Sequence, residues 1–157
     1  MTRAARRRAI VAAAGLLILG TAGAVVYAVV PHGVDVAVPD YTGTGCDAAT
    51  RAWPERVAGH DGVTTSPPSP RTRAWGDPAV VARCGVPALG PTTYECLDVD
   101  CVDWVVERLS DGARFTTFGR DPAIEVLVPN AYAPEPLLLP AFAPAATALP
   151  ENGRHCT

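Results

Sequence analysis

The sequence predicts an α+β protein: an N-terminal transmembrane helix, then a small disulfide-linked domain in which a mainly antiparallel sheet of four or five strands carries two helices on one face. Three observations lead to this class. Residues 10–30 form an uncharged apolar run, several later segments alternate apolar and other residues with period two, and all five cysteines of the 157-residue chain follow the apolar run. One small domain is therefore expected over residues 31–157.

The N-terminal segment has the composition of a membrane anchor. Residues 1–9 carry four arginines and no acid, and residues 10–30 carry no charge. At about 1.5 Å per residue this run spans roughly 30 Å, the thickness of a hydrocarbon core. We expect a retained anchor, with a cleaved signal peptide as the alternative, since signal peptides have shorter apolar stretches. The arginines keep the basic stub in the cytoplasm, so the protein is expected to span the cell membrane once with residues 31–157 outside.

Two segments of the domain resemble each other. Residues 34–41 (VDVAVPDY) and 124–132 (IEVLVPNAY) both alternate apolar and other residues and then reach Val-Pro, as a strand that ends in a turn should. A helix is expected after each, over 46–59 and 134–149. The pattern predicts a β-loop-α unit used twice. Two prolines inside the second helix remove backbone donors and are expected to divide it into short turns.

Three further strands are predicted between these units, at 78–86 (PAVVARCGV), 102–109 (VDWVVERL) and 113–119 (ARFTTFG). The last two are joined by Ser-Asp-Gly, whose Asp-Gly pair tolerates positive φ, so they are expected to form a hairpin. The stretch 64–73 (TTSPPSPRTR) is predicted to be an extended, polyproline-like surface loop.

The cysteines predict disulfides. All five lie in the part placed outside the cytoplasm, where thiols oxidise: Cys46, Cys84, Cys96, Cys101 and Cys156. The spacing contains no Cys-x-x-Cys pair that would complete a tetrahedral zinc site, so no metal ligands are assigned among them. Four cysteines can pair and one is left over.

Charge excludes one class of partner. Residues 31–157 hold nine arginines against sixteen acids, a net charge of −7. A nucleic-acid partner is not expected, because it would need a basic face. The acidic run around Asp98, Asp100 and Asp103 lacks the loop glycine and later glutamate of an EF-hand, so a solvated turn is predicted there and no metal site.

Three quoted stretches carry a family resemblance: WGDPAVVARCGVP, VDWVVE and FTTFGRDPAIEVLVP. In this order they resemble the actinobacterial domain-of-unknown-function family 3515, small extracytoplasmic proteins with an N-terminal membrane segment and no established activity. The resemblance implies disulfides between Cys84 and Cys96 and between Cys46 and Cys156. The chain departs from the family pattern at Cys101, where a glycine is expected. It therefore stays open whether Cys96 or Cys101 pairs with Cys84.

Two interpretations exist for the leftover Cys101. It is either a reactive thiol or intermolecular bridge, or else a structural residue, which means a buried small hydrophobe or an alternative partner for Cys84. We favour the second. The stretch from Trp75 to Cys84 is interpreted as structural, with the tryptophan in the core and a turn at Gly-Asp-Pro. A catalytic role for Cys84 is not favoured, because a disulfide-bonded cysteine has no thiolate.

The best candidate for ligand binding is the loop TTFGRDP. Its residues Thr116, Thr117, Gly119 and Arg120 combine hydroxyls, a flexible backbone position and a guanidinium that could hold a carboxylate or phosphate. The competing and favoured interpretation is that Asp121 or a loop carbonyl satisfies Arg120 internally.

No catalytic residues are assigned. His32, His60 and His155 lie next to the anchor, in a loop and in the tail, and the chain has no Gly-x-Ser-x-Gly elbow, His-Glu-x-x-His helix or Gly-rich phosphate loop. We therefore expect a non-enzymatic interaction module of the cell envelope, without a cofactor, whose partner is an envelope protein or cell-wall component. The second hypothesis is a binder of a small anionic ligand at the TTFGRDP loop. An envelope hydrolase or redox enzyme is the third.

Overall fold

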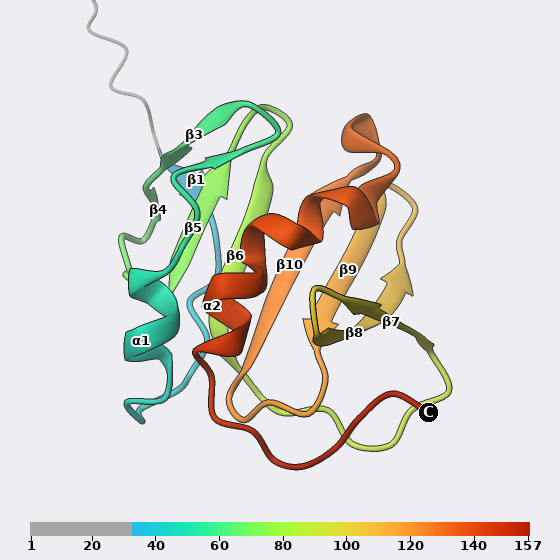
Figure 1. Ribbon diagram of the computed structural model, residues 1–157. Helices are drawn as coiled ribbons and strands as arrows, with labels where there is room; N and C mark the ends of the chain where they lie inside the picture. The colour runs from blue at the N-terminus through green and yellow to red at the C-terminus, as the bar shows by residue number, and fades with distance from the viewer. Residues whose placement is uncertain (1–32) are drawn as a thin grey trace, which may run out of the picture. The chain divides into compact units, whose positions relative to one another are not determined.

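The central element is an eight-stranded antiparallel sheet, shown in Figure 1 in a computed structural model that describes residues 33–157. The strands lie in the order β2-β3-β5-β6-β10-β9-β8-β7. They are β2 (Arg56–Val57), β3 (His60–Val63), β5 (Thr72–Trp75), β6 (Val80–Val86), β7 (Glu95–Val99), β8 (Val102–Arg108), β9 (Gly112–Thr117) and β10 (Ala123–Pro129). The predicted antiparallel sheet with two α-helices is confirmed for these residues, but eight strands in place of four or five make the domain mostly β.

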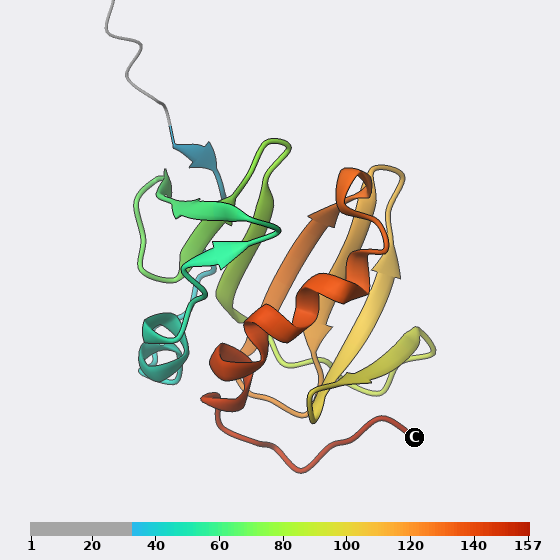
Figure 2. The same ribbon diagram turned by 45° about the horizontal axis from the view of Figure 1, so that its top comes forward.

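Helices cover one face of the sheet (Figures 1 and 2). They are α1 (Cys46–Arg51), the 3₁₀-helix η2 (Glu135–Phe142) and α2 (Ala143–Thr147), with the short 3₁₀-helix η1 (Asn130–Tyr132) directly after β10. The first helix stops well before its predicted end, because Pro54 disfavours helical geometry in the residue before it. The second is divided between η2 and α2, as its two prolines require.

The predicted first β-loop-α unit is present only in a shortened form, because a strand and the helix α1 do follow one another in this segment. Its strand β1 (Val34–Asp35) has two residues and pairs in parallel with β4 (Thr65–Ser66), outside the eight-stranded sheet. The first copy of the predicted unit therefore has a much shorter strand than expected, and that strand is not part of the main sheet. The second copy does supply β10, which lies between β6 and β9.

Burial follows the predicted period of two along the first part of β6, whereas β8, β9 and β10 have consecutive buried residues because both faces of the central sheet are partly covered. In β6, Val80, Ala82 and Cys84 are fully buried, whereas Val81 and Arg83 are half-buried. Successive side chains of a strand point to opposite faces, so the first set faces the helices and the second faces away from them.

The hairpins follow local turn chemistry. Ser-Asp-Gly joins β8 to β9 as predicted. Asp100 and Cys101 both have positive φ, 53° and 62°, and form the two-residue turn between β7 and β8, which matches the backbone of a type I′ turn. The predicted acidic turn is therefore confined to these two residues, since Asp98 belongs to β7 and Asp103 to β8.

The core lies between the helices and the sheet. Trp75, Trp104, Phe115 and Phe142 are all fully buried there. The ring of Trp75 meets that of Phe142 edge to face at 5.4 Å, and its Nε1 donates to the carbonyl of Pro54 at 3.1 Å. The interpretation of Trp75 as scaffold is confirmed.

The disulfides differ from those implied by the family resemblance. Cys46 pairs with Cys84, and Cys96 pairs with Cys156, with Cα atoms 5.9 Å apart in each pair. The implied Cys84–Cys96 and Cys46–Cys156 pairs are wrong. Cys84 lies on β6 and Cys96 on β7, and three strands separate them in the sheet. At about 4.8 Å per strand the two cysteines are roughly 19 Å apart, too far for a disulfide.

The described residues belong to one compact unit, Pro31–Thr157. Within residues 33–157, no helix has both the length and the apolar character that crossing a membrane requires. The predicted stub 1–9, the predicted anchor 10–30 and His32 lie outside the described residues.

Candidate functional site

The four residues of the predicted ligand loop do not converge on one pocket. Thr117 is fully buried on the helix side of β9, and its Oγ1 accepts a hydrogen bond from the backbone N–H of Ile124 at 3.0 Å. Thr116, its neighbour, points to the opposite face of the sheet and is 7% exposed. Gly119 and Arg120 follow the end of the strand. The two hydroxyls are therefore separated from each other by the sheet.

The C-terminal tail occupies the position where a ligand of Arg120 would lie. Nη1 of Arg120 donates to the carbonyl of Leu149 at 3.1 Å and lies 3.0 Å from Oε1 of Glu151. The carbonyl of Gly119 accepts from the backbone N–H of Asn152 at 2.9 Å. A Cβ added to Gly119 would lie 2.1 Å from the carbonyl oxygen of Arg154, so the tail packs directly on this glycine. The interpretation that a loop carbonyl satisfies Arg120 is confirmed.

Cys101 is exposed and unpaired among the described cysteines, so its predicted burial is wrong. It lies at the β7–β8 turn and lines a cavity of about 60 Å³ together with Asp103, Arg120 and His155. Nδ1 of His155 is 3.3 Å from Oδ2 of Asp103, but the imidazole is largely in solvent. The cavity is far smaller than the roughly 300–1,000 Å³ of small-molecule sites.

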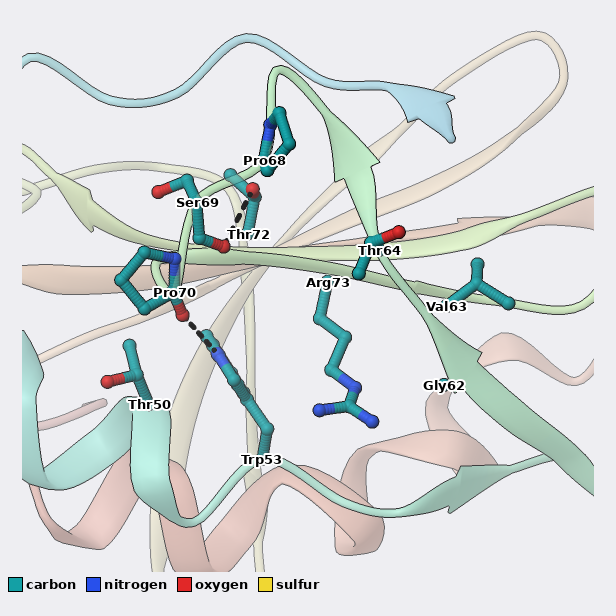
Figure 3. Close-up of a pocket in the computed structure, with 10 residues that line it drawn as sticks. All are labelled: Thr50, Trp53, Gly62, Val63, Thr64, Pro68, Ser69, Pro70, Thr72 and Arg73. Atoms are coloured by element: carbon teal, nitrogen blue, oxygen red, sulfur yellow. Dashed lines mark hydrogen bonds between the residues drawn. The ribbon is translucent and has the colours of Figure 1, made fainter. Parts of the chain in front are cut away.

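A larger groove opens at the other end of the sheet, between α1, the loop that precedes β5, and strands β3 and β5 (Figure 3). Its volume is about 490 Å³, within the usual size range of small-molecule sites. We call it the Arg73 groove. Its lining consists of Thr50, Trp53, Gly62, Val63, Thr64, Pro68, Ser69, Pro70, Thr72 and Arg73.

Strand register brings Arg73 into this groove. Arg73 is opposite Ala82 in the β5–β6 ladder, and Ala82 is a core residue, so both side chains lie on the helix side of the sheet. Figure 3 shows the Arg73 side chain extending into the groove, with Trp53 on one side of the guanidinium and Gly62 on the other.

Gly62 makes room for this guanidinium. A Cβ added at Gly62 would lie 2.3 Å from Nε and 2.7 Å from Nη2 of Arg73. Any other residue at this position would push the arginine out of its place against β3. The glycine therefore sets where the positive charge lies in the groove.

Arg73 has no carboxylate partner among residues 33–157, and its Nε is buried without a hydrogen bond. Nε of Arg114 is also buried without a hydrogen bond in the described part of the chain, but two other strand arginines differ from Arg73 in having carboxylate partners. Arg83 lies 2.7 Å from Glu125, and Arg114 lies 2.8 Å from Glu107. A buried N–H that is left without an acceptor is energetically unfavourable, about 1–3 kcal/mol. The terminal Nη groups of Arg73 also have no hydrogen bond to residues 33–157, so these donors, and not the buried Nε, are available to a ligand in the groove.

Several other polar groups of the groove are already bound within the domain. Nε1 of Trp53 donates to the carbonyl of Pro70 at 3.1 Å, and the hydroxyl of Thr72 contacts that of Thr65. Oγ of Ser69 accepts from a backbone N–H at 3.2 Å, which leaves its own proton free to donate. Thr64 is exposed, and its hydroxyl makes no hydrogen bond to residues 33–157. Ser69 and Thr64 therefore keep hydroxyl protons that no residue among 33–157 accepts, and Arg73 is the lining residue whose donors extend into the groove.

The groups that line the Arg73 groove can hold an anion. The sequence alone did not predict this site. The segment that contains Arg73 was predicted to be a surface loop, whereas its last two residues begin β5. The alternation of Thr72, Arg73, Ala74 and Trp75 was the available signal. This alternation indicates that Arg73 shares a face of the strand with the core residue Trp75. It does not indicate whether an acidic residue lies opposite Arg73.

Comparison with known protein families assigns the chain to a family. No curated protein and no solved structure is significantly similar to the chain. The family model described as protein of unknown function (DUF3515) matches residues 9–151, which is most of the chain. The protein therefore belongs to the DUF3515 family.

Proposed function

We propose that this protein is a non-catalytic binding module of the cell envelope, anchored in the cell membrane by residues 10–30 and exposing residues 31–157 outside the cytoplasm. Its partner is an envelope protein or a cell-wall component, which presents an anionic group to the Arg73 groove. The observation that carries the proposal is the guanidinium of Arg73, which lies in the groove without a carboxylate partner in the described residues.

Two features support the location. The basic stub and the uncharged run after it have the charge asymmetry and length of an anchor with its N-terminus inside. The two disulfides join segments 38 and 60 residues apart in the sequence. Disulfides of this kind persist in oxidising compartments outside the cytoplasm.

The lining of the groove supports binding rather than catalysis. Its polar side chains are one guanidinium and several hydroxyls, and none of the described lining residues is a His, Cys, Asp or Glu. A general base or an activated nucleophile needs a group of that kind in hydrogen-bond reach. Hydrogen-bond donors alone can hold and orient an anion.

The proposal is tested by sedimentation with envelope material. Purified residues 31–157, which form one compact unit with both disulfides, are mixed with washed cell-wall and membrane fractions of the source organism. The unmodified domain is expected to sediment with at least one fraction, and Arg73→Gln is expected to lower the bound amount about tenfold, the effect of losing roughly 1.4 kcal/mol.

The matched control is Arg51→Gln, which removes the same charge from an exposed position of α1 that does not line the groove. This variant should bind like the unmodified domain. Equal binding by Arg73→Gln and the unmodified domain, with equal thermal unfolding temperatures, would contradict the proposed role of the groove.

A further inference from the structure

We infer that the ligand of the Arg73 groove is a saccharide that carries a carboxylate. This inference rests on the proposed function, in which the groove binds an anionic group, and it names the chemical class of that group and of the scaffold attached to it. Three properties of the groove carry it: its charge, the chemistry of its walls and its size.

Within residues 33–157, the lining of the groove carries one positive charge, which a ligand with one negative charge would balance. Arg73 is the one charged residue of the described lining. A carboxylate is singly charged, and its two oxygens fit the parallel N–H donors of a guanidinium. A phosphate monoester carries nearly two charges at neutral pH, so one of them would be left without a counter-charge in this groove. The groove therefore favours a carboxylate over a phosphate monoester.

The walls are formed by apolar rings and by residues that carry hydroxyls. The indole of Trp53 and the rings of Pro68 and Pro70 form apolar surface, and Nε1 of Trp53 is already bound to the carbonyl of Pro70. Thr64 and Ser69 also line the groove, and Figure 3 shows both of their side-chain hydroxyls directed away from Arg73. A sugar ring has the matching pattern, with C–H faces that pack on apolar rings and hydroxyls that exchange hydrogen bonds with threonine and serine.

The size of the groove requires more than an isolated carboxylate. Its volume of about 490 Å³ lies in the range in which small-molecule sites enclose a ring-sized ligand. A carboxylate on Arg73 would fill only the part next to Gly62, against which the guanidinium lies. The attached scaffold must then cover Trp53 and the prolines if it is to displace water from their apolar surface.

The inference is tested with four probes at one ionic strength: glucuronate, glucose, acetate and glucose 6-phosphate. Binding to the purified domain, residues 31–157, is measured by calorimetry. Glucuronate is expected to bind at least tenfold more tightly than acetate or glucose, because it has both the charge and the ring. Glucose 6-phosphate is expected to bind more weakly than glucuronate.

Three variants show where the probe binds. Arg73→Gln should lower glucuronate affinity at least tenfold, and Arg73→Lys should give an intermediate loss, because it keeps the charge without the planar fork. Arg51→Gln should leave the affinity unchanged. Thermal unfolding of each variant shows whether it is folded, and Arg73→Lys preserves the test if Arg73→Gln is not.

The outcomes separate this inference from the proposed function. Equal affinity for acetate and glucuronate would overturn the saccharide class, although an anion site would remain. Tighter binding of glucose 6-phosphate would overturn the carboxylate. If no probe binds while sedimentation with envelope material still depends on Arg73, the ligand class is wrong and the proposed function stands. If neither the binding of the probes nor the sedimentation with envelope material depends on Arg73, both the inferred ligand class and the proposed function are wrong.

Discussion

Replacing Trp75 with alanine is expected to remove a large part of the stability of the domain, about 3–5 kcal/mol. The side chain is fully buried, packs edge to face on Phe142 and donates a hydrogen bond to the carbonyl of Pro54. It therefore joins the sheet both to η2 and to the segment that follows α1. Since small domains are stable by only about 5–15 kcal/mol, the variant should unfold at much lower urea concentration.

Two further variants calibrate this result. Trp75→Phe keeps an aromatic ring in the core but loses the hydrogen bond to the carbonyl of Pro54. We expect the lost hydrogen bond to lower the free energy of unfolding by about 1 kcal/mol, in addition to the effect of the smaller ring. Leu137→Ala truncates a side chain that is 72% exposed and should change stability by less than about 0.5 kcal/mol. Equal urea midpoints for Trp75→Ala and Leu137→Ala would show that Trp75 is not part of the core.

Removing the disulfide between Cys46 and Cys84 is expected to cost about 4 kcal/mol, the chain-entropy estimate for a loop of this length. Both cysteines are fully buried, and the bond fixes α1 to β6. The double variant Cys46→Ala with Cys84→Ala should therefore melt lower by on the order of 15 °C. Thermal unfolding of residues 31–157 measures the change.

A control variant and a mapping experiment test the predicted effect of the Cys46–Cys84 disulfide. Cys101→Ser changes an exposed, unpaired cysteine and should leave the melting temperature nearly unchanged. Peptide mapping of the unreduced protein should recover Cys46 linked to Cys84. A peptide that links Cys84 to Cys96 would contradict the strand order, because the two lie on strands separated by three others.

The strands that the sequence predicts are those with a regular alternation. The segments around Val80, Val102, Phe115 and Val126 became β6, β8, β9 and β10, because each has a continuous apolar face to bury against the helices. The strands that were missed, β2 to β5 and β7, are short, polar or exposed on at least one face. Their pairing depends on neighbours that are distant in the sequence.

The candidate site shows a second limit of sequence reasoning. Arg120 has the local surroundings of a ligand-binding arginine, but Leu149 and Glu151 satisfy it from the far end of the chain. The proline-rich sequence around Arg73 does not indicate a binding site, yet the fold leaves Arg73 without a carboxylate partner in the described residues. Whether an arginine is available to a ligand depends on three-dimensional neighbours, which spacing along the chain does not specify.

The most direct measurement is therefore an NMR titration that follows the guanidinium resonances of the nine arginines in residues 31–157, each assigned by substitution, as glucuronate is added. The account predicts that the resonances of Arg73 shift and saturate, while those of Arg120, held by the C-terminal tail, stay in place. A saturating shift at Arg120 with none at Arg73 would contradict it and return the anion site to the loop that the sequence first indicated.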